Sequence, residues 1–236
     1  MKTIAVIQAR LGSTRLPGKI LLPLAGKSML QNVVERVRRA KLVDEVWFTF
    51  PGDGAAPQIL PVLDACDVMV HFSPSLLEND LIARLLLTVK ASLADAVIRI
   101  CADNPCVEWE QIDWLCAQIP ALPEKCRLLK LNSESFIGNH DGFGGELYPL
   151  EMLEWMDRTI KDPEYREHPH KFFRDIFAWH YLGKDYPRGF RLDVNTEAEY
   201  QKLKAIYDHF GRNDFTVREV MDYLTTANLE ERHIPT

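Results

Sequence analysis

The 236-residue sequence has no apolar run that approaches the ~18 residues a helix needs to cross a membrane. No secretory signal is visible, because the short apolar run at residues 3–9 leads directly into Arg10. The five cysteines are odd in number and form no CxxC pair, which argues against a disulfide framework or a zinc site and favours reduced, mostly buried thiols. Internal repeats and low-complexity tracts are also missing. These absences predict a cytoplasmic globular protein with no membrane partner.

The charge is unevenly distributed along the chain. The 28 Lys and Arg residues against 34 Asp and Glu give a net charge of −6, which argues against a nucleic-acid coat protein, since such proteins are usually basic. Residues 1–41, however, carry nine basic residues and one acidic residue (+8), which leaves 19 basic and 33 acidic residues elsewhere (−14). We therefore expect the N-terminal segment to meet an anion. Some of these cations need no anionic ligand. A predicted helix ends with four of them, Arg36, Arg38, Arg39 and Lys41, and cations at the end of a helix offset its dipole.

Short β-branched segments alternate with longer amphipathic ones. Strands are predicted at 3–9, 45–50, 68–72, 96–101, near 128–131 and at 189–194, and helices at 28–40, 58–66, 79–93, 109–119, 150–160, from 168, at 196–210 and at 216–224. This alternation is typical of right-handed βαβ units and predicts an α/β fold, with three layers and a mostly parallel sheet, in a single domain over residues 1–236. The looser pattern at about 133–187 predicts an insertion that forms a lid or a dimer contact.

A basic loop with two glycines follows the first predicted strand, at residues 9–19 (ARLGSTRLPGK). Open α/β sheets bind ligands beyond the carboxyl ends of their strands. Glycines allow backbone N–H groups to approach phosphate oxygens, and cations supply the opposite charge. The spacing is not that of a Walker A motif, since five residues separate Gly12 from Gly18 and Ile20 follows the lysine; GxGxxG is absent too. The pattern favours a phosphate-binding loop over its alternative, a tight basic turn on a solvated surface.

With Gln8 before it and residues 21–27 (LLPLAGK) after it, this loop closely resembles the bacterial cytidylyltransferase family, which includes the CMP-sialate and CMP-KDO synthetases. The nearest branch is the spore coat polysaccharide F type, and the resemblance is dense over residues 3–110 and patchy over 140–200. It implies a Rossmann-like nucleotidyltransferase fold and a homodimer. It also implies transfer of CMP from CTP to an acidic sugar or related small anionic acceptor, with release of pyrophosphate. The implied nucleotide-binding residues in this loop are Gln8, Ala9, Arg10, Leu11, Gly12, Ser13, Arg15 and Lys19, of which Arg10 and Lys19 are also implied to be catalytic.

A second matching segment is NDLIAR at residues 79–84. By resemblance, Asp80 and Arg84 help to place the cytosine base. The residues alone leave a simpler alternative open, because the same spacing describes an i,i+4 ion pair on a helix.

The first candidate metal ligand is Asp103, which ends the predicted strand 96–101 just before Pro105. Mg²⁺ favours one or two carboxylates together with substrate phosphates. Asp103 matches the catalytic metal-binding Asp in a Gly-Asp-x-Pro segment of the family, although Ala102 replaces the glycine. The alternative is an Asp turn.

The second candidate lies at residues 191–197 (RLDVNTE), where Asn195 stands at the family's most regular Asp and Asp193 comes two residues earlier. Residues two apart in an extended strand face the same side. Asp193 can therefore supply the charge for Mg²⁺ while Asn195 supplies a neutral oxygen. Asn195 can instead cap the following helix.

The resemblance assigns the acceptor to later segments. The loop DGFGGE at 141–146 corresponds to one that faces the acceptor sugar, although Gly144 stands where the family often has Asp. An Arg-Glu-His segment begins at residue 166, for which dimer packing is an alternative role. The implied acceptor-binding residues are Asp141, Glu146, Arg166, His168 and Arg191.

These features predict in-line attack by an acceptor oxygen on the α-phosphorus of CTP, with Mg²⁺ on Asp103 and Asp193. Two other functions stay open. One is a sugar-nucleotide-dependent glycosyltransferase of similar fold, for which Asp193-Val194-Asn195 is half of an Asp-x-Asp site. The other is a catalytically silent nucleotide-binding module, suggested by Asn195 and Gly144.

Overall fold

The computed structural model describes residues 1–9, 13–51, 56–73, 77–119, 136–137, 142–177, 181–182 and 191–226. The predicted strand near 128–131 lies outside these residues, as do four predicted site residues, Arg10, Leu11, Gly12 and Asp141.

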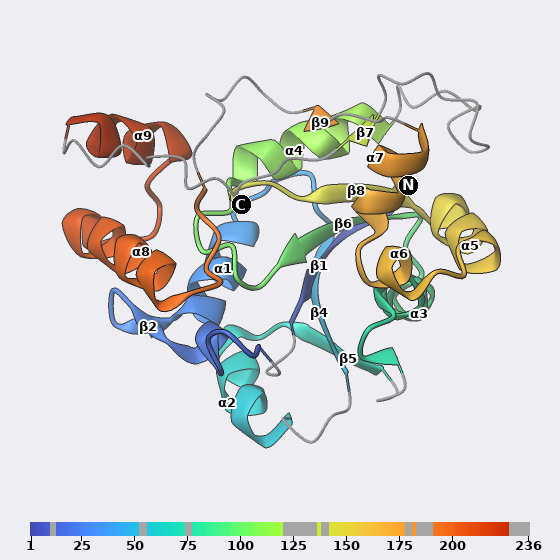
Figure 1. The fold of residues 1–236 in the computed structure, drawn as a ribbon, viewed down its shortest axis with the longest axis horizontal. Helices are drawn as coiled ribbons and strands as arrows, with labels where there is room; N and C mark the ends of the chain where they lie inside the picture. Colours follow the sequence, from blue (N-terminus) through green and yellow to red (C-terminus); the bar gives the residue numbers. More distant parts are fainter. Residues whose placement is uncertain are drawn as a thin grey trace.

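A five-stranded sheet forms the centre of the molecule, in the order β5-β4-β1-β6-β8 (Figure 1). Its strands are β1 (Thr3–Gln8), β4 (Glu45–Pro51), β5 (Met69–Ser73), β6 (Ala96–Cys101) and β8 (Glu146–Pro149). The first four are parallel, and β8 runs antiparallel to β6. The prediction of a mostly parallel α/β sheet is confirmed. The strand β8 was not predicted, because four residues that include a glutamate and a proline carry no strand pattern.

The remaining short elements lie outside this sheet. They are the 3₁₀ turn η1 (Lys19–Leu21), the antiparallel pair β2 (Pro23–Leu24) and β3 (Lys27–Ser28), and the parallel pair β7 (Phe136–Ile137) and β9 (Tyr181–Leu182). The strand predicted at 189–194 is wrong for residues 191–194, which are not in a strand. The backbone N–H of Val194 instead donates to the carbonyl oxygen of Asp103 over 2.9 Å.

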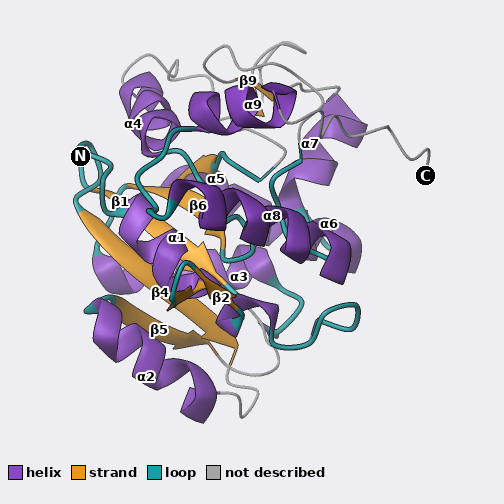
Figure 2. Cartoon of the chain, turned by 90° about the vertical axis from the view of Figure 1, so that its left-hand side faces the viewer, coloured by secondary structure: helices purple, strands orange, loops and turns teal. Residues whose placement is uncertain are grey.

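Helices cover both faces of the sheet (Figures 1 and 2). One layer contains α1 (Met29–Val37), α2 (Ala56–Cys66) and α4 (Trp109–Gln118); the other contains α3 (Leu81–Ser92), α5 (Leu150–Thr159), α6 (Pro163–Glu167) and α7 (Pro169–Phe177). Successive side chains of a strand point to opposite faces. Accordingly, Ala5 and Ile7 of β1 join the first apolar core, while Ile4 and Val6 join the second. The three predicted layers are therefore confirmed, and Phe173 of α7 is fully buried in the second core.

The last two helices, α8 (Glu197–Phe210) and α9 (Val217–Thr226), form a third apolar cluster next to α1. Arg36 of α1 is completely buried there. Its guanidinium donates to the carbonyl oxygens of Val107 (2.8 Å), Asn213 (2.7 Å) and Phe215 (2.9 Å). Arg36 lies in the last turn of α1, as predicted, but its guanidinium does more than offset the helix dipole. Arg36 ties the turn before α4 to the segment before α9.

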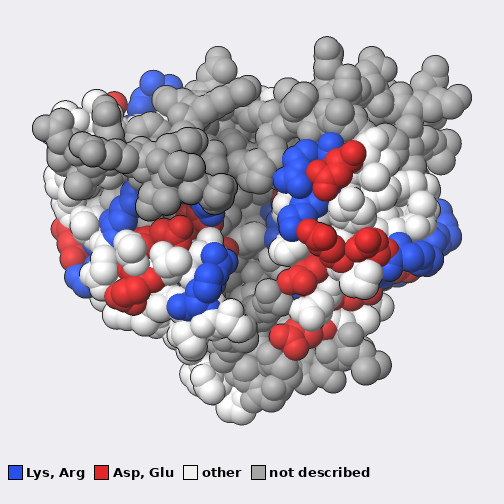
Figure 3. Space-filling view, viewed as in Figure 1, with Lys and Arg blue, Asp and Glu red and all other residues white. Residues whose placement is uncertain are grey.

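Two surface findings bear on partners. In the described part of the chain, no helix is both long and apolar enough to cross a membrane. On the face in Figure 3, Lys and Arg side chains lie among Asp and Glu side chains rather than in a continuous basic surface. An evenly basic surface of the kind that binds nucleic acid is therefore not seen on the described part of this face.

Candidate functional site

A cavity of about 410 Å³ lies at the carboxyl ends of β1 and β6. This is the edge of an open α/β sheet at which ligands bind. The residues that line it come from the basic loop, both strand ends, α3, the α6–α7 junction and the segment before α8: Gln8, Ala9, Ser13, Thr14, Arg15, Lys19, Ile20, Glu78, Arg84, Arg99, Cys101, Ala102, Asp103, Glu167, His168 and Asn195. The structure therefore brings the described part of the predicted phosphate loop to the same cavity as two predicted metal ligands.

Lys19 lies where three oxygens converge. Its Nζ is 2.5 Å from Asp103 Oδ2, 2.7 Å from the carbonyl oxygen of Val194 and 3.1 Å from Asn195 Oδ1. The Lys19 side chain is only 10% exposed. Gly18, at φ +65°, turns the chain into η1 immediately before it, in the left-handed region that glycine adopts without strain.

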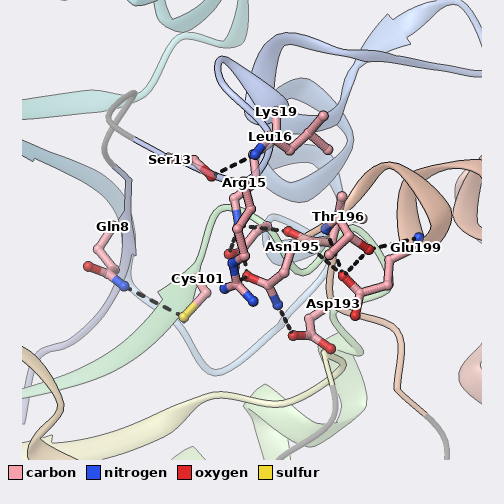
Figure 4. A network of polar contacts seen from close by, with 12 residues as sticks. Gln8, Ser13, Arg15, Leu16, Lys19, Cys101, Asp193, Asn195, Thr196 and Glu199 are labelled. Atoms are coloured by element: carbon pink, nitrogen blue, oxygen red, sulfur yellow. Dashed lines mark hydrogen bonds and ion pairs between the residues drawn. The ribbon is translucent and has the colours of Figure 1, made fainter. Parts of the chain in front are cut away.

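Asn195 connects the basic loop with Asp193 (Figure 4). Its Oδ1 also accepts a hydrogen bond from Arg15 (3.2 Å), and its Nδ2 donates to Asp193 Oδ2 (2.5 Å). The alternative that Asn195 caps α8 is wrong: Thr196 is the N-cap, and its side chain accepts from the backbone N–H of Glu199. The Asn195 side chain therefore faces the cavity although the segment is not a strand.

The oxygens around Lys19 are suited to a small divalent cation. The described residues contain no group of three or more His, Cys, Asp or Glu side chains that would hold a metal on their own. Mg²⁺ does not require such a group, since it is usually held by one or two carboxylates plus substrate phosphates. Asp103 and Asn195 supply a carboxylate and an amide oxygen within 3.1 Å of one common point, the Lys19 ammonium. This donor set fits the metal.

The two residues predicted to bind the base, Asp80 and Arg84, have different surroundings in the structure. Arg84 lines the cavity and donates to Gln8 Oε1 (3.2 Å), whose Nε2 in turn donates to Cys101 Sγ (3.6 Å). Burial raises the pKa of Cys101 to about 11, so this thiol is neutral at physiological pH. Asp80 is the N-cap of α3 and pairs with Arg166 over 2.7 Å, so the ion pair that the structure records for it is not the i,i+4 pair of the alternative interpretation.

The predicted acceptor residues occupy different places. His168 lines the cavity, and burial lowers the pKa of its imidazole. Arg166 joins α6 to Asp80 and to the C-terminal end of α5, where it also binds Asp157 (2.6 Å). Arg191 is 54% exposed and pairs with Asp193 (2.9 Å). Neither arginine is among the described cavity residues.

Glu146 is 6% exposed and pairs with Arg99 of β6, a cavity residue that the sequence analysis missed. Burial alone would raise the pKa of Glu146, but Arg99, with smaller contributions from His170 and Tyr148, holds that pKa far below its usual range. The one sequence signal for Arg99 is a charged residue inside the buried apolar run AVIRIC. Such a residue needs a partner when it is buried.

Gly142 fixes the loop before β8 against the segment that carries Asp193. Its φ is +86°, and a Cβ atom at this position would lie 2.1 Å from the backbone nitrogen of Asp193. No side chain fits between the two backbones.

Known proteins resemble this chain over most of its length. A family model described as Cytidylyltransferase matches residues 4–207. The spore coat polysaccharide biosynthesis protein SpsF of Bacillus subtilis is 26% identical over 231 residues, which cover 93% of this chain and 92% of that protein. A cytidylyltransferase structure from Leptospira borgpetersenii matches with a TM-score of 0.85 and 24% identity over the whole of both chains.

Two further related structures are of complexes. A CMP:2-keto-3-deoxy-manno-octonic acid synthetase complexed with CTP matches with a TM-score of 0.64 at 19% identity, covering 89% of this chain and 99% of that one. A Mycobacterium tuberculosis protein, Rv0371c, in complex with manganese matches with a TM-score of 0.60 at 17% identity, covering 87% and 99%. At these identities the structural matches establish the fold, which is that of nucleotidyltransferases.

Proposed function

The chain belongs to the cytidylyltransferase family of nucleotidyltransferases, and on this premise we propose that it transfers CMP from CTP to a small anionic acceptor and releases pyrophosphate. One observation carries the proposal: a single cavity is lined by cations of the basic loop, Arg15 and Lys19, and by the oxygen ligands Asp103 and Asn195. A triphosphate needs both, because its charge is neutralised by cations of the protein and by a metal ion.

Each group has a definite part in this reaction. Ser13, Arg15 and Lys19 bind the triphosphate, and Arg15 and Lys19 stabilise the charge that develops on the leaving pyrophosphate. Arg84 and Gln8 lie on the α3 side of the cavity and contact each other there; they would bind the cytosine base of CTP. No covalent intermediate is needed, since positioning and charge neutralisation supply most of the catalysis in such transfers.

Asp103 and Asn195 would hold Mg²⁺, and Asp193 orients Asn195 through its hydrogen bond. When bound, Mg²⁺ would neutralise phosphate oxygens and polarise the α-phosphorus. Manganese in a related structure and CTP in another support this assignment of cofactor and donor. The relatives also suggest the acceptor: one is a synthetase that acts on a keto-deoxy sugar acid and another belongs to spore coat polysaccharide biosynthesis. A homodimer is part of the proposal, to be checked by light scattering.

The experiment mixes the protein, Mg²⁺ and each of the four NTPs with a panel of sugar acids, phosphorylated sugars and neutral sugars, and measures pyrophosphate and products by mass spectrometry. We expect release of pyrophosphate with CTP well above that with ATP, GTP or UTP, and a CMP adduct of one acceptor. Calorimetry provides the control for binding. CTP binding without turnover would favour the silent module, and a nucleoside diphosphate formed from a sugar nucleotide would favour the glycosyltransferase. If CTP neither binds nor gives more pyrophosphate than the other nucleotides, the proposal is wrong.

A further inference from the structure

Arg166 of α6 holds three helices together. Its side chain is 15% exposed, and it is not among the described residues that line the cavity. The guanidinium pairs with two carboxylates, through Nε with Asp80 Oδ2 (2.7 Å) and through Nη2 with Asp157 Oδ1 (2.6 Å). Its Nη1 donates to the carbonyl oxygens of Ile160 (2.8 Å) and Asp157 (3.2 Å), at the carboxyl end of α5. The planar fork of an arginine can fix three segments in this way, whereas a lysine ammonium cannot.

The partner Asp80 belongs to the start of α3, next to which α6 lies (Figure 1). Its other carboxylate oxygen, Oδ1, accepts from the backbone N–H of Ala83 (3.0 Å), and its carbonyl oxygen accepts from the N–H of Arg84 (3.1 Å). Glu78 and Arg84, on either side of Asp80 in the chain, both line the cavity. The ion pair with Arg166 therefore leads to the segment that the proposed function assigns to the cytosine base.

The residues that follow Arg166 form another part of the cavity wall. Glu167 and His168, at the junction of α6 and α7, line the cavity, and the proposed function uses neither for CTP or for the metal. The helix α6 has five residues, and so short a helix is stable only through tertiary contacts. The ion pair with Asp80 is such a contact, and it leads directly from this junction to α3.

We propose that Arg166 is a positioning residue for the transfer reaction: through Asp80, it holds the α6–α7 junction in a fixed position relative to the nucleotide. The inference rests on the proposed function, in which Arg84 contacts the base and the junction is left to the acceptor. The resemblance to the family implies direct acceptor binding by Arg166, whereas the geometry gives it an indirect part. Its two carboxylate partners differ in one respect, since Asp80 leads to the cavity while no described residue of α5, the helix of Asp157, lines it.

The test removes one carboxylate partner at a time. Asp80→Asn keeps an oxygen that caps α3, because Asn and Asp are equally good N-caps, and it removes the charge that pairs with Arg166. Asp157→Asn is the matched control, since it removes the other charge from the same guanidinium at a helix outside the described cavity wall. Arg166→Lys keeps the positive charge without the fork.

Four quantities are measured on each full-length variant. Hydrogen exchange followed by mass spectrometry reports on residues 163–171 in the protein alone. Calorimetry gives the Kd of CTP in the presence of Mg²⁺. Pyrophosphate release with CTP and 2-keto-3-deoxy-manno-octonic acid, the acid in the name of one related synthetase, gives the acceptor Km. Urea denaturation gives the global stability.

We expect Asp80→Asn to speed exchange at residues 163–171 and to raise the acceptor Km about tenfold, because a small displacement of a positioning element is costly. The Kd of CTP should change less than about twofold, since Arg84 keeps its place on the capped helix. Asp157→Asn should lose a similar amount of stability and leave both the exchange and the acceptor Km within about twofold of the wild type. Arg166→Lys should give an intermediate acceptor Km.

Equal effects of the two Asn variants would show that Arg166 only stabilises the fold, and they would overturn the inference. A rise in the Kd of CTP without a rise in the acceptor Km would place Asp80 at the base and would also overturn it. Where the wild type binds CTP but does not use this acid, the comparison of exchange rates decides alone. Failure of the proposed function is a separate outcome, in which the wild type does not bind CTP.

Discussion

The Nζ atom of Lys19 lies 2.5 Å from Oδ2 of Asp103, and the two residues are 84 positions apart in the chain. In the proposed reaction, Lys19 binds phosphate and Asp103 binds the metal, so the contact between the two residues occupies groups that both ligands need. The same ammonium contacts Asn195, the second proposed metal ligand. Metal and nucleotide therefore compete with this internal ion pair, and they should bind most readily as a complex.

Replacing Lys19 by methionine tests this relationship. We expect Lys19→Met to weaken CTP binding about ten- to hundredfold, in line with the ~1.5–3 kcal/mol of a charged hydrogen bond, and to lower kcat strongly. We also expect the variant to bind Mn²⁺ without nucleotide more tightly than the wild type does, because the ammonium no longer competes for Asp103. Calorimetry and the Mn²⁺ paramagnetic resonance signal measure these effects, and Lys27→Met, an exposed lysine paired with Glu35, is the control. Equal Mn²⁺ affinity in variant and wild type would contradict the competition.

A second substitution adds a negative charge at the proposed metal site instead of removing a positive one. Asn195→Asp adds a charged oxygen where the amide oxygen now lies 3.1 Å from Lys19, and it replaces a hydrogen-bond donor to Asp193 by a like charge. Both effects favour a bound cation. We expect the Mg²⁺ concentration for half-maximal activity to fall about three- to tenfold, or ~0.6–1.4 kcal/mol. A Mg²⁺ titration at saturating CTP measures the change. A requirement for more Mg²⁺ would show that Asn195 is not a ligand.

Much of the fold was predictable because its signals are local. The apolar run at Thr3–Gln8 forms a buried strand, and Ser28 forms the capping box of α1. The pair Arg99–Glu146 could not be predicted, since its members are 47 positions apart and β8 has no strand pattern of its own. Residues 191–194 were predicted to form a strand because a sequence pattern does not reveal whether a neighbouring strand is available to pair with. Resemblance placed Lys19 and Asp103 in one site, but only the structure shows that they contact each other.

Arg36 is expected to be the most important cation for stability. Arg36→Met removes donors from four backbone carbonyl oxygens and a cation that lies 4.7 Å from the ring centroid of Phe215. We expect the free energy of unfolding to fall by about 3 kcal/mol or more, since buried acceptors are left unsatisfied. Arg38→Met, two residues on and exposed, should change it by less than ~0.5 kcal/mol. Urea denaturation measures both; equal effects would contradict the structural role of Arg36.

Gly142 should affect both stability and activity, because its backbone lies against the segment that carries Asp193 and the proposed metal ligand Asn195. In Gly142→Ala, a left-handed φ of +86° costs about 1–2 kcal/mol, and a Cβ atom 2.1 Å from Asp193 N adds an overlap of about 1–3 kcal/mol. The matched control is Gly211→Ala at the end of α8, where φ is +61° and no atom lies within 4 Å of the added Cβ. We expect the control to lose only the φ cost and to keep its Mg²⁺ requirement. Gly142→Ala should lose more stability and require more Mg²⁺, since relief of the overlap displaces Asp193 and, through it, Asn195. Thermal unfolding and a Mg²⁺ titration on both variants decide the point, and a Gly142→Ala variant with the control's stability and wild-type Mg²⁺ dependence would show that the two backbones separate without disturbing the site.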